Sequence, residues 1–199
     1  MMPETIMLNV SAIWLPDFQQ QNFRAILEAM ARPGSFQVLA LNGSTLKSDV
    51  LEDAYIAVLA SLLDNSVTVA DPNKLISQDY SALLQAKRVD SDQADFIMCR
   101  GDLLPDFEPK LGTLPSPELS ATIILNVEKI DDCQQGDLNL RLTGPGINGQ
   151  KNCAISGLDL SWLGAREEWI SSFPLGVDLL LVDDTKVMAL PRTTKVEQV

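Results

Sequence analysis

The sequence predicts an α/β fold with a mixed sheet and helices on both faces. Strand-like and helix-like segments alternate from residue 17 to residue 99, which is typical of a parallel sheet with crossover helices. Near its end the chain reads GVDLLLV, an Asp-Asp-Thr turn and KVMAL, the pattern of an antiparallel hairpin. Hydrophobic residues make up 46% of the 199 residues, so a packed core can form, and the length suits one domain over residues 1–199.

The first predicted helix begins at Asp17, whose carboxylate can cap it, and ends at Arg32-Pro33-Gly34. Apolar residues recur along it at helical spacing and are expected on its inner side: Phe23, Ile26, Leu27 and Met30. The segment that follows, SFQVLAL at 35–41, has the composition of a strand.

A second helix is predicted from residue 50 to about residue 63. It is apolar almost all round, so we expect it to be deeply buried. SVTVA at 66–70 is the next strand. A third helix is predicted from Asp71-Pro72 to about residue 87, with aspartate as its cap and proline in its first position. The strand at 94–99 completes this alternating series.

An irregular connection with four prolines between residues 101 and 117 comes next. Connections of more than about 15 residues are uncommon in compact domains, and those that occur are often functional or docked to something. Strands are then expected at 121–127 and 138–143, and a helix over 159–170. The inner side of this helix is expected to carry Leu160, Trp162 and Leu163.

The composition excludes several classes of function. A net charge of −12 argues against general binding to nucleic acid or to anionic membranes. The sequence contains no histidine, so it cannot form a Ser-His-Asp triad or a histidine-based metal site, and its acidic residues form no recognisable metal set. Three cysteines without a C-x-x-C pair, no basic signal-like segment and no long apolar run predict a reduced, cytoplasmic protein without a membrane anchor.

Gly144, Gly146 and Gly149 match G-x-G-x-x-G, the fingerprint of dinucleotide-binding enzymes. The fingerprint requires a helix directly after the loop, because the helix N-terminus faces the pyrophosphate. Here Pro145 removes a backbone donor and QKNCAISG shows no helical period. The sequence therefore favours a tight turn that leaves a strand.

Four residues are candidates for holding an anionic ligand: Arg32, Arg141, Arg192 and Thr193. An arginine beside a glycine-rich turn can bind a phosphate or carboxylate bidentately. Each residue also has an ordinary interpretation. Arg141 can be a solvated edge residue or an interface anchor, Arg32 can belong to a helix stop, and Arg192-Thr193 can begin a terminal strand. No catalytic residue is assigned.

Four stretches of the sequence together resemble one known family, the H subunit of the bacterial carbon–phosphorus lyase system (PhnH). They are FRAILEAMARPGSF, LRLTGPGI, FPLGVDLLLV and ALPRTTKVE, and they occur in that family's order between about residue 18 and residue 197. FPLGVD followed closely by PRTTKVE is the most specific part of the resemblance.

The resemblance implies a three-layer α/β/α sandwich related to the large domain of pyridoxal-phosphate-dependent transferases, without the cofactor. It also implies a subunit in phosphonate catabolism with the G, I and J subunits as partners, and a homodimer when isolated. With G, I and L the family is required to transfer the ribose triphosphate moiety of ATP to methylphosphonate. A structural or interaction role is expected; the alternative is direct binding of an anionic phosphonate or nucleotide by this chain.

Overall fold

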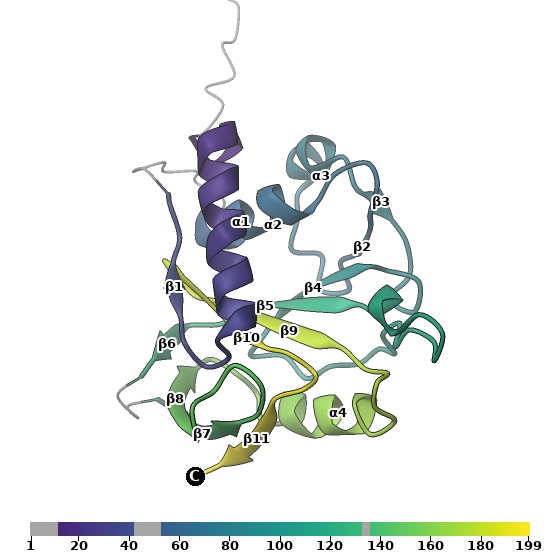
Figure 1. The fold of residues 1–199 in the computed structure, drawn as a ribbon. Helices are drawn as coiled ribbons and strands as arrows, with labels where there is room; N and C mark the ends of the chain where they lie inside the picture. Colours follow the sequence, from purple (N-terminus) through teal and green to yellow (C-terminus); the bar gives the residue numbers. More distant parts are fainter. Residues whose placement is uncertain (1–11, 42–52, 133–135) are drawn as a thin grey trace, which may run out of the picture.

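The computed structural model describes residues 12–41, 53–132 and 136–199, which form two sheets and their covering helices (Figure 1). The large sheet is mixed and has the order β1-β10-β9-β5-β4-β2-β3. Its strands are β1 Gln37–Val38, β10 Lys186–Leu190, β9 Asp178–Val182, β5 Thr122–Asn126, β4 Phe96–Arg100, β2 Thr68–Ala70 and β3 Lys87–Arg88. Strands β2, β4, β5 and β9 run parallel, and β9 with β10 forms the predicted antiparallel hairpin.

The small sheet is antiparallel and has the order β11-β7-β8-β6. Its strands are β11 Lys195–Gln198, β7 Leu138–Thr143, β8 Lys151–Ser156 and β6 Lys129–Asp131. The α-helices are α1 Pro16–Ala31, α2 Asp53–Leu62, α3 Gln78–Leu84 and α4 Ser161–Trp169, and short 3-10 helices span Ala12–Trp14 and Pro117–Leu119. None of the helices in the described residues is both long and apolar enough to cross a bilayer.

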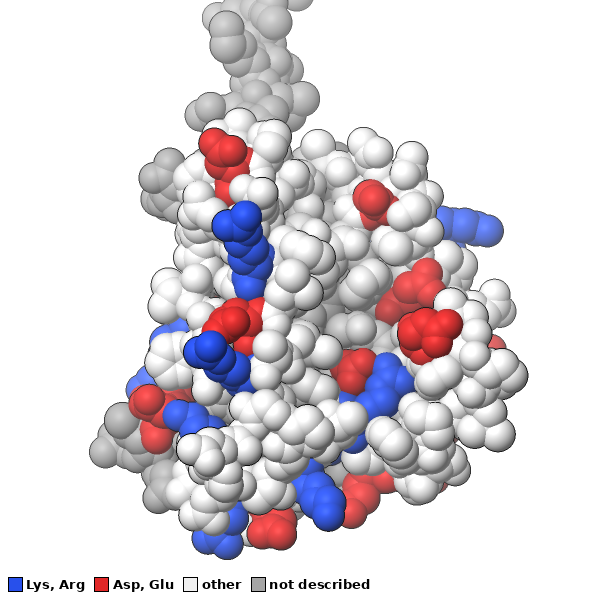
Figure 2. Space-filling view, viewed as in Figure 1, with Lys and Arg blue, Asp and Glu red and all other residues white. Residues whose placement is uncertain are grey.

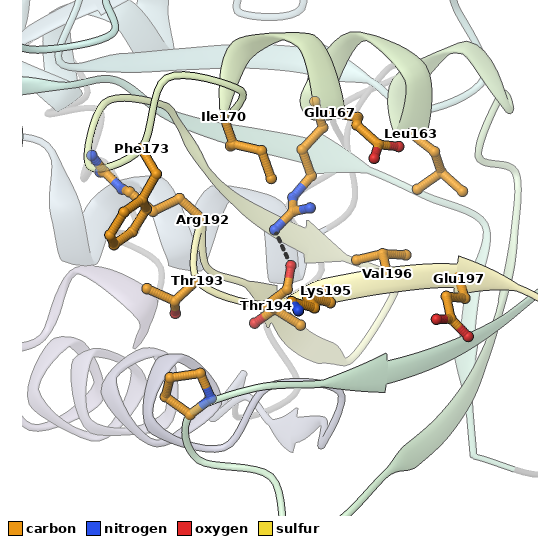
Figure 3. Close-up of a pocket in the computed structure, with 12 residues that line it drawn as sticks. Leu163, Glu167, Ile170, Phe173, Arg192, Thr193, Thr194, Lys195, Val196 and Glu197 are labelled. Carbon is orange, nitrogen blue, oxygen red and sulfur yellow. Dashed lines mark hydrogen bonds between the residues drawn. The ribbon is translucent and has the colours of Figure 1, made fainter.

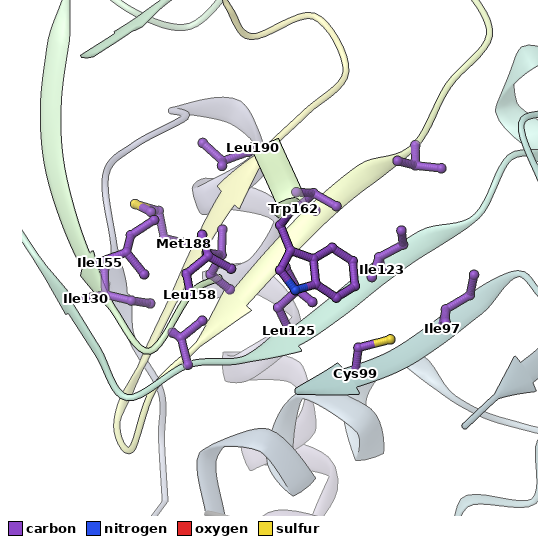
Figure 4. Packing of buried hydrophobic residues seen from close by; sticks show 14 of the residues in the cluster. Ile97, Cys99, Ile123, Leu125, Ile130, Ile155, Leu158, Trp162, Met188 and Leu190 are labelled. Atoms are coloured by element: carbon purple, nitrogen blue, oxygen red, sulfur yellow. The ribbon is translucent and has the colours of Figure 1, made fainter. Parts of the chain in front are cut away.

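The two faces of the large sheet are covered differently. Helices α1 to α3 lie on one face, whereas the small sheet and α4 lie on the other (Figure 1). A hydrophobic core lies on each face of the large sheet, and strand β5 contributes side chains to both because they alternate. Ile124 belongs to the core on the helical side, and Ile123 and Leu125 belong to the other core. Figure 4 shows these last two side chains beside Trp162 of α4.

The prediction of a mixed sheet is confirmed, and helix α4 lies on the second face as predicted, but a small antiparallel sheet that was not predicted covers this face as well. The strand at 138–143 of this small sheet was predicted, but without its partners. β6 and β8 are three and six residues long. KID is too short to show a period, and KNCAIS lacks the regular alternation that marks a half-buried strand.

Helix α1 is rotated from its predicted orientation and starts earlier. Its N-cap residue is Leu15, so Asp17 lies in the first turn and does not cap it. Phe23 and Leu27 are 43% and 52% exposed, and the buried residues are Asn22, Ile26 and Ala29. The Asn22 side chain hydrogen-bonds both the N–H and the carbonyl of Ala40, which explains how a polar residue can occupy the inner face.

The helix predicted from Asp71 is much shorter in the structure. The Asp71 carboxylate accepts hydrogen bonds from the N–H groups of Leu75 and Ile76, at 2.8 and 3.0 Å, and stabilises a turn. Helix α3 begins only at Gln78, and the segment expected to end the helix forms strand β3. An aspartate that bonds nearby N–H groups favours turns as readily as helix starts.

The proline-rich connection is irregular, as predicted, and it packs on α4. The Phe107 ring stacks on Trp169 with 5.9 Å between ring centroids. The Trp162 indole N–H donates to the carbonyl of Leu103 at 2.7 Å. The inner side of α4 carries Trp162, Arg166 and Trp169; Leu160, expected there, is 53% exposed.

Candidate functional site

Three loops that are distant in sequence meet at one place: residues 31–34, residues 144–146 and residues 191–194. Gly146 has φ +81°, and a Cβ atom there would lie 2.2 Å from the carbonyl oxygen of Ala31. A Cβ atom at Gly144 would lie 2.8 Å from the carbonyl oxygen of Thr193. These glycines allow close contact between backbones, and their loop leads into strand β8 and not into a helix. The tight-turn interpretation is therefore confirmed.

A pocket of about 610 Å³ lies between α4 and the C-terminal segment. Helix α4 and the residue after it contribute Leu163, Arg166, Glu167 and Ile170; the opposite wall is residues 192–197. Pro145 and Phe173 complete the lining. Figure 3 shows Glu167 on α4 and Ile170 at its C-terminal end, above Thr193 and Thr194 on the segment below.

The pocket takes in Arg192 and Thr193 of the four predicted ligand residues, and its lining does not include Arg32 or Arg141. Arg32 forms an exposed ion pair with Glu28 at 3.0 Å, one helical turn away. Arg141 projects from β7 on the side opposite the buried leucines, as predicted, and its Nη1 lies 3.9 Å from a carboxylate oxygen of Glu197 on β11. The carboxylate of Glu197 is at the pocket rim.

Arg192 uses its guanidinium to join several segments. Nη2 lies 2.6 Å from a carboxylate oxygen of Asp178, in an ion pair whose side chains are only 14% and 15% exposed. Nη2 also donates to the Ser120 hydroxyl, and Nη1 donates to the carbonyl of Pro117 at 2.9 Å. A second, longer bond from Nη1 reaches the carbonyl of Pro174 at 3.5 Å. The guanidinium therefore ties the proline-rich connection and the 173–176 loop to the end of the large sheet.

Arg166 is the buried cation of the pocket, and the sequence interpretation missed it. Its residue surface is 3% exposed, and Nη2 donates to the carbonyls of Pro191 and Thr194 at 2.6 and 2.8 Å. Nε is buried without a hydrogen-bond partner. Burial lowers its pKa to about 10, against the opposing charges of Asp178 and Glu167, so Arg166 is cationic at neutral pH.

A signal for Arg166 was present in the sequence. Trp162, Arg166 and Trp169 follow each other at i, i+4 and i+7, which places all three on one face of a helix. Because both tryptophans are large and apolar, that face is the one expected to be buried. The arginine between them is thus a candidate for a buried charge.

The remaining chemistry of the described surface is sparse. No group of three or more Asp, Glu or Cys side chains in residues 12–41, 53–132 and 136–199 is arranged to hold a metal ion. Cys99 and Cys153 are buried free thiols; burial raises the pKa of Cys153 to about 11 and that of Cys99 further. Cys133 lies outside the described residues. On the face in Figure 2, acidic and basic side chains are interspersed among uncharged ones.

Fold and site define a two-sheet α/β protein in which three proline-containing loops meet beside a pocket with a buried arginine. The chain belongs to the PhnH family, described as bacterial phosphonate metabolism protein, which matches residues 13–197.

Two curated relatives agree with this family. One, "Putative C-P lyase subunit protein HtxG" of Stutzerimonas stutzeri, is 36% identical over 184 residues, covering 92% of this chain and 88% of the relative. The other, alpha-D-ribose 1-methylphosphonate 5-triphosphate synthase subunit PhnH of Rhizobium meliloti (strain 1021), is 29% identical over 195 residues and is covered to 92%, as is this chain.

Proposed function

We propose that this chain is the H-type subunit of a cytoplasmic carbon–phosphorus lyase complex in organic phosphonate catabolism. Its role is structural and consists of contacts with other subunits. With the G, I and L subunits it is required for the transfer of the ribose triphosphate moiety of ATP to methylphosphonate. The observation that carries this proposal is the family match over residues 13–197, supported by relatives that align along almost their whole length.

The partners in this proposal are the G, I and J subunits, and the isolated chain forms a homodimer. The surface we assign to subunit contact is the loop surface, defined as Leu114, Leu119 and Phe173. These side chains are 72%, 53% and 65% exposed. Exposed apolar side chains that lie together mark surfaces of interaction. Arg192 bonds the carbonyls of Pro117 and Pro174, so it brings the two loops that carry them together. Apolar and aromatic side chains at such a position favour a protein partner.

Co-purification tests the proposal directly. The tagged chain is co-expressed with the G, I and J subunits, and the subunits retained on the tag are quantified. We expect wild type to retain them and the double variant Leu114→Ser/Phe173→Ser to lose most of them. Leu83→Ser, at a 46% exposed leucine on α3, is the matched control and is expected to behave as wild type. A wild-type chain that retains no subunit contradicts the assignment to the complex, and a double variant that still retains them contradicts the loop surface.

The proposal also includes a scaffold related to the large domain of pyridoxal-phosphate-dependent transferases that works without the cofactor. Pyridoxal phosphate needs a lysine amino group for its Schiff base. The Lys186 amino group donates to the carbonyl of Ile130 at 2.9 Å and lies 4.5 Å from the centroid of the Phe36 ring, away from the pocket lining. We expect the purified protein mixed with pyridoxal phosphate to give no reducible lysine adduct in excess of that of a denatured control.

A further inference from the structure

The Arg166 guanidinium is a buried charge without a counter-charge in contact. Its hydrogen bonds to described residues use Nη2 and end on two backbone carbonyls. No carboxylate of the described residues forms an ion pair with it, whereas Arg192 nearby is paired with Asp178. Removing a charge from water costs several kcal/mol unless an opposite charge or a full set of hydrogen bonds compensates it. Such a group is a candidate for pairing with an anion that enters from outside.

The pocket offers room for that anion at the right place. Thr194, beside Arg166, is 1% exposed, and its hydroxyl has no hydrogen-bond partner in the described structure. Figure 3 shows the dashed hydrogen bond that ends on Thr194, at the wall opposite α4. Two nearly buried residues of the lining, one of them cationic, therefore each have a polar atom without a hydrogen-bond partner in the described structure.

The rest of the pocket has a mixed lining. Leu163, Ile170, Phe173 and Val196 supply apolar walls, and Lys195 and Thr193 stand near its opening, where both are exposed. Glu167 and Glu197 also line the pocket but are exposed to solvent, so their charges are screened more strongly than that of buried Arg166. A volume of about 610 Å³ is within the usual range of small-molecule sites.

We propose that this pocket binds a small organic oxyanion. The acid group meets the Arg166 guanidinium and the Thr194 hydroxyl, and the apolar part of the molecule lies against Ile170 and Phe173. Lys195 and Thr193 hold the outer end. This site goes beyond the role in subunit contact. It shares Phe173 with the loop surface, but it rests on Arg166 and on the pocket, so it does not depend on that role. Only the choice of phosphonate among the probes follows from the family.

Isothermal titration of the purified full-length chain tests the site. The probes are phenylphosphonate, benzoate, ATP and inorganic phosphate, each at matched ionic strength. Phenylphosphonate and benzoate combine an acid group with an apolar body, ATP is larger, and phosphate lacks the apolar part. We expect saturable binding of at least one of the first three probes and weaker binding of phosphate. If none of the probes binds saturably to the wild-type chain, the proposal is overturned.

Variants then locate the site. Arg166→Gln removes the charge but keeps an amide that can donate to the carbonyls of Pro191 and Thr194. Because a hydrogen bond to a charged group contributes about 1.5–3 kcal/mol, we expect affinity to fall about 10- to 100-fold. Arg24→Gln, at an exposed position in the middle of α1, makes the same change in charge and is expected to bind as wild type.

A second variant keeps the proposal testable if Arg166→Gln does not fold. Lys195→Gln changes an exposed residue, so folding is expected to be kept, and affinity is expected to fall about 3- to 10-fold, in line with a solvated cation near the ligand. If Arg166→Gln does not fold, the Lys195→Gln result decides the question. The proposal is overturned if Lys195→Gln and every Arg166 variant that folds bind with wild-type affinity. It is also overturned if Arg24→Gln loses as much affinity as the variants in the pocket.

Discussion

The two faces of the large sheet bury similar amounts of apolar side chain but differ in their polar content. The helical face is covered by α2, in which residues 54–60 are all buried, and by α1. Its buried polar side chains bond the backbone: the Asn22 amide bonds both backbone groups of Ala40, and the Tyr55 hydroxyl donates to the Ile124 carbonyl at 2.8 Å. The elements that cover the other face carry Arg166 and the hydrogen bonds of Asp183 to β6, and the three converging loops meet beside them. Both faces therefore bury polar groups, but on the second face one of them is a guanidinium, that of Arg166, which forms no ion pair with the described residues.

Truncation of one core side chain on each face should lower the free energy of unfolding by similar amounts if the two faces are packed equally tightly. Trp162→Ala on the α4 side is expected to lower the free energy of unfolding by about 4 kcal/mol, because Trp162 is 1% exposed. Ile56→Ala in α2 should cost about 3 kcal/mol. Urea unfolding followed by circular dichroism measures both. Trp162→Phe keeps an aromatic ring but loses the hydrogen bond to Leu103, and it should cost about 2 kcal/mol. If Trp162→Ala lowered the free energy of unfolding by less than Trp162→Phe does, tight packing under α4 would be contradicted.

The ion pairs should differ much more than the apolar cores. Arg192→Met leaves Asp178 without its cation in a mostly buried place and removes the bonds to Ser120 and Pro117, so we expect a loss of about 3 kcal/mol in the free energy of unfolding. The matched exposed change is Arg32→Met, which breaks the pair with Glu28 on α1 and should cost about 0.3 kcal/mol. Equal losses in the two variants, measured by urea unfolding, would show that Arg192 is not a structural tie.

Buried polar contacts give a smaller difference between the faces. The Asp183 carboxylate accepts hydrogen bonds from the N–H groups of Ile130, Thr185 and Lys186, at 2.9, 2.9 and 2.7 Å, and so links β6 to the β9–β10 turn. Asp183→Asn should lower the free energy of unfolding by about 2 kcal/mol, because an amide cannot accept all three bonds. Tyr55→Phe on the helical face removes one bond and should cost about 1 kcal/mol. Thermal unfolding measures both variants, and a larger loss of stability in Tyr55→Phe than in Asp183→Asn would contradict this account.

The smallest expected effect is a pH dependence from Asp95, between β2 and the proline-rich connection. Burial raises the pKa of Asp95, but hydrogen bonds from Lys110 and Thr68, with the charge of Lys110, outweigh it and leave the pKa below its usual value. A carboxylate with a lowered folded pKa stabilises the protein above its unfolded pKa, about 4, and this contribution is lost as the pH falls through the folded pKa.

The corresponding experiment compares the free energy of unfolding of wild type and Asp95→Asn as the pH falls from 6 to 2. We expect the gap between the two proteins to narrow below about pH 4. A gap that stays constant across this range would mean that the charge of Asp95 contributes nothing to stability. Asp64→Asn, whose carboxylate bonds only its neighbour Ser66, serves as an exposed comparison.

Much of the large sheet could be predicted because its strands are contiguous apolar runs between clear turns. The segments at 94–99, 121–127 and the final hairpin all appear within one or two residues of their predicted positions. The prediction of a helix over 71–87 was wrong because the Asp71 side chain, which can cap a helix, here bonds the N–H groups of a turn. The outer face of α1 was misassigned because Asn22, a polar residue, finds two partners on Ala40 and takes an inner position.

The candidate site, too, could be predicted only in part from the sequence. PRTT and GPG were identified as notable from the sequence, and the structure brings both beside one pocket. Only the tertiary structure shows that Arg192 is paired with Asp178, whereas Arg166, on the buried face of α4, has no counter-charge in contact among the described residues. Whether an arginine is available to a ligand depends on which carboxylate packs against it, and that depends on contacts between distant segments.

The sequence by itself determined the α/β class, the apolar runs that become the large sheet, the acidic balance and the family. These follow from side-chain polarity and its period, which are local properties of the chain. The tertiary structure decided that a second sheet covers one face, that the three loops meet, and which arginine lies buried beside the pocket. These outcomes depend on which segments pack together, and no local pattern encodes the contacts between residues 31–34, 144–146 and 191–194.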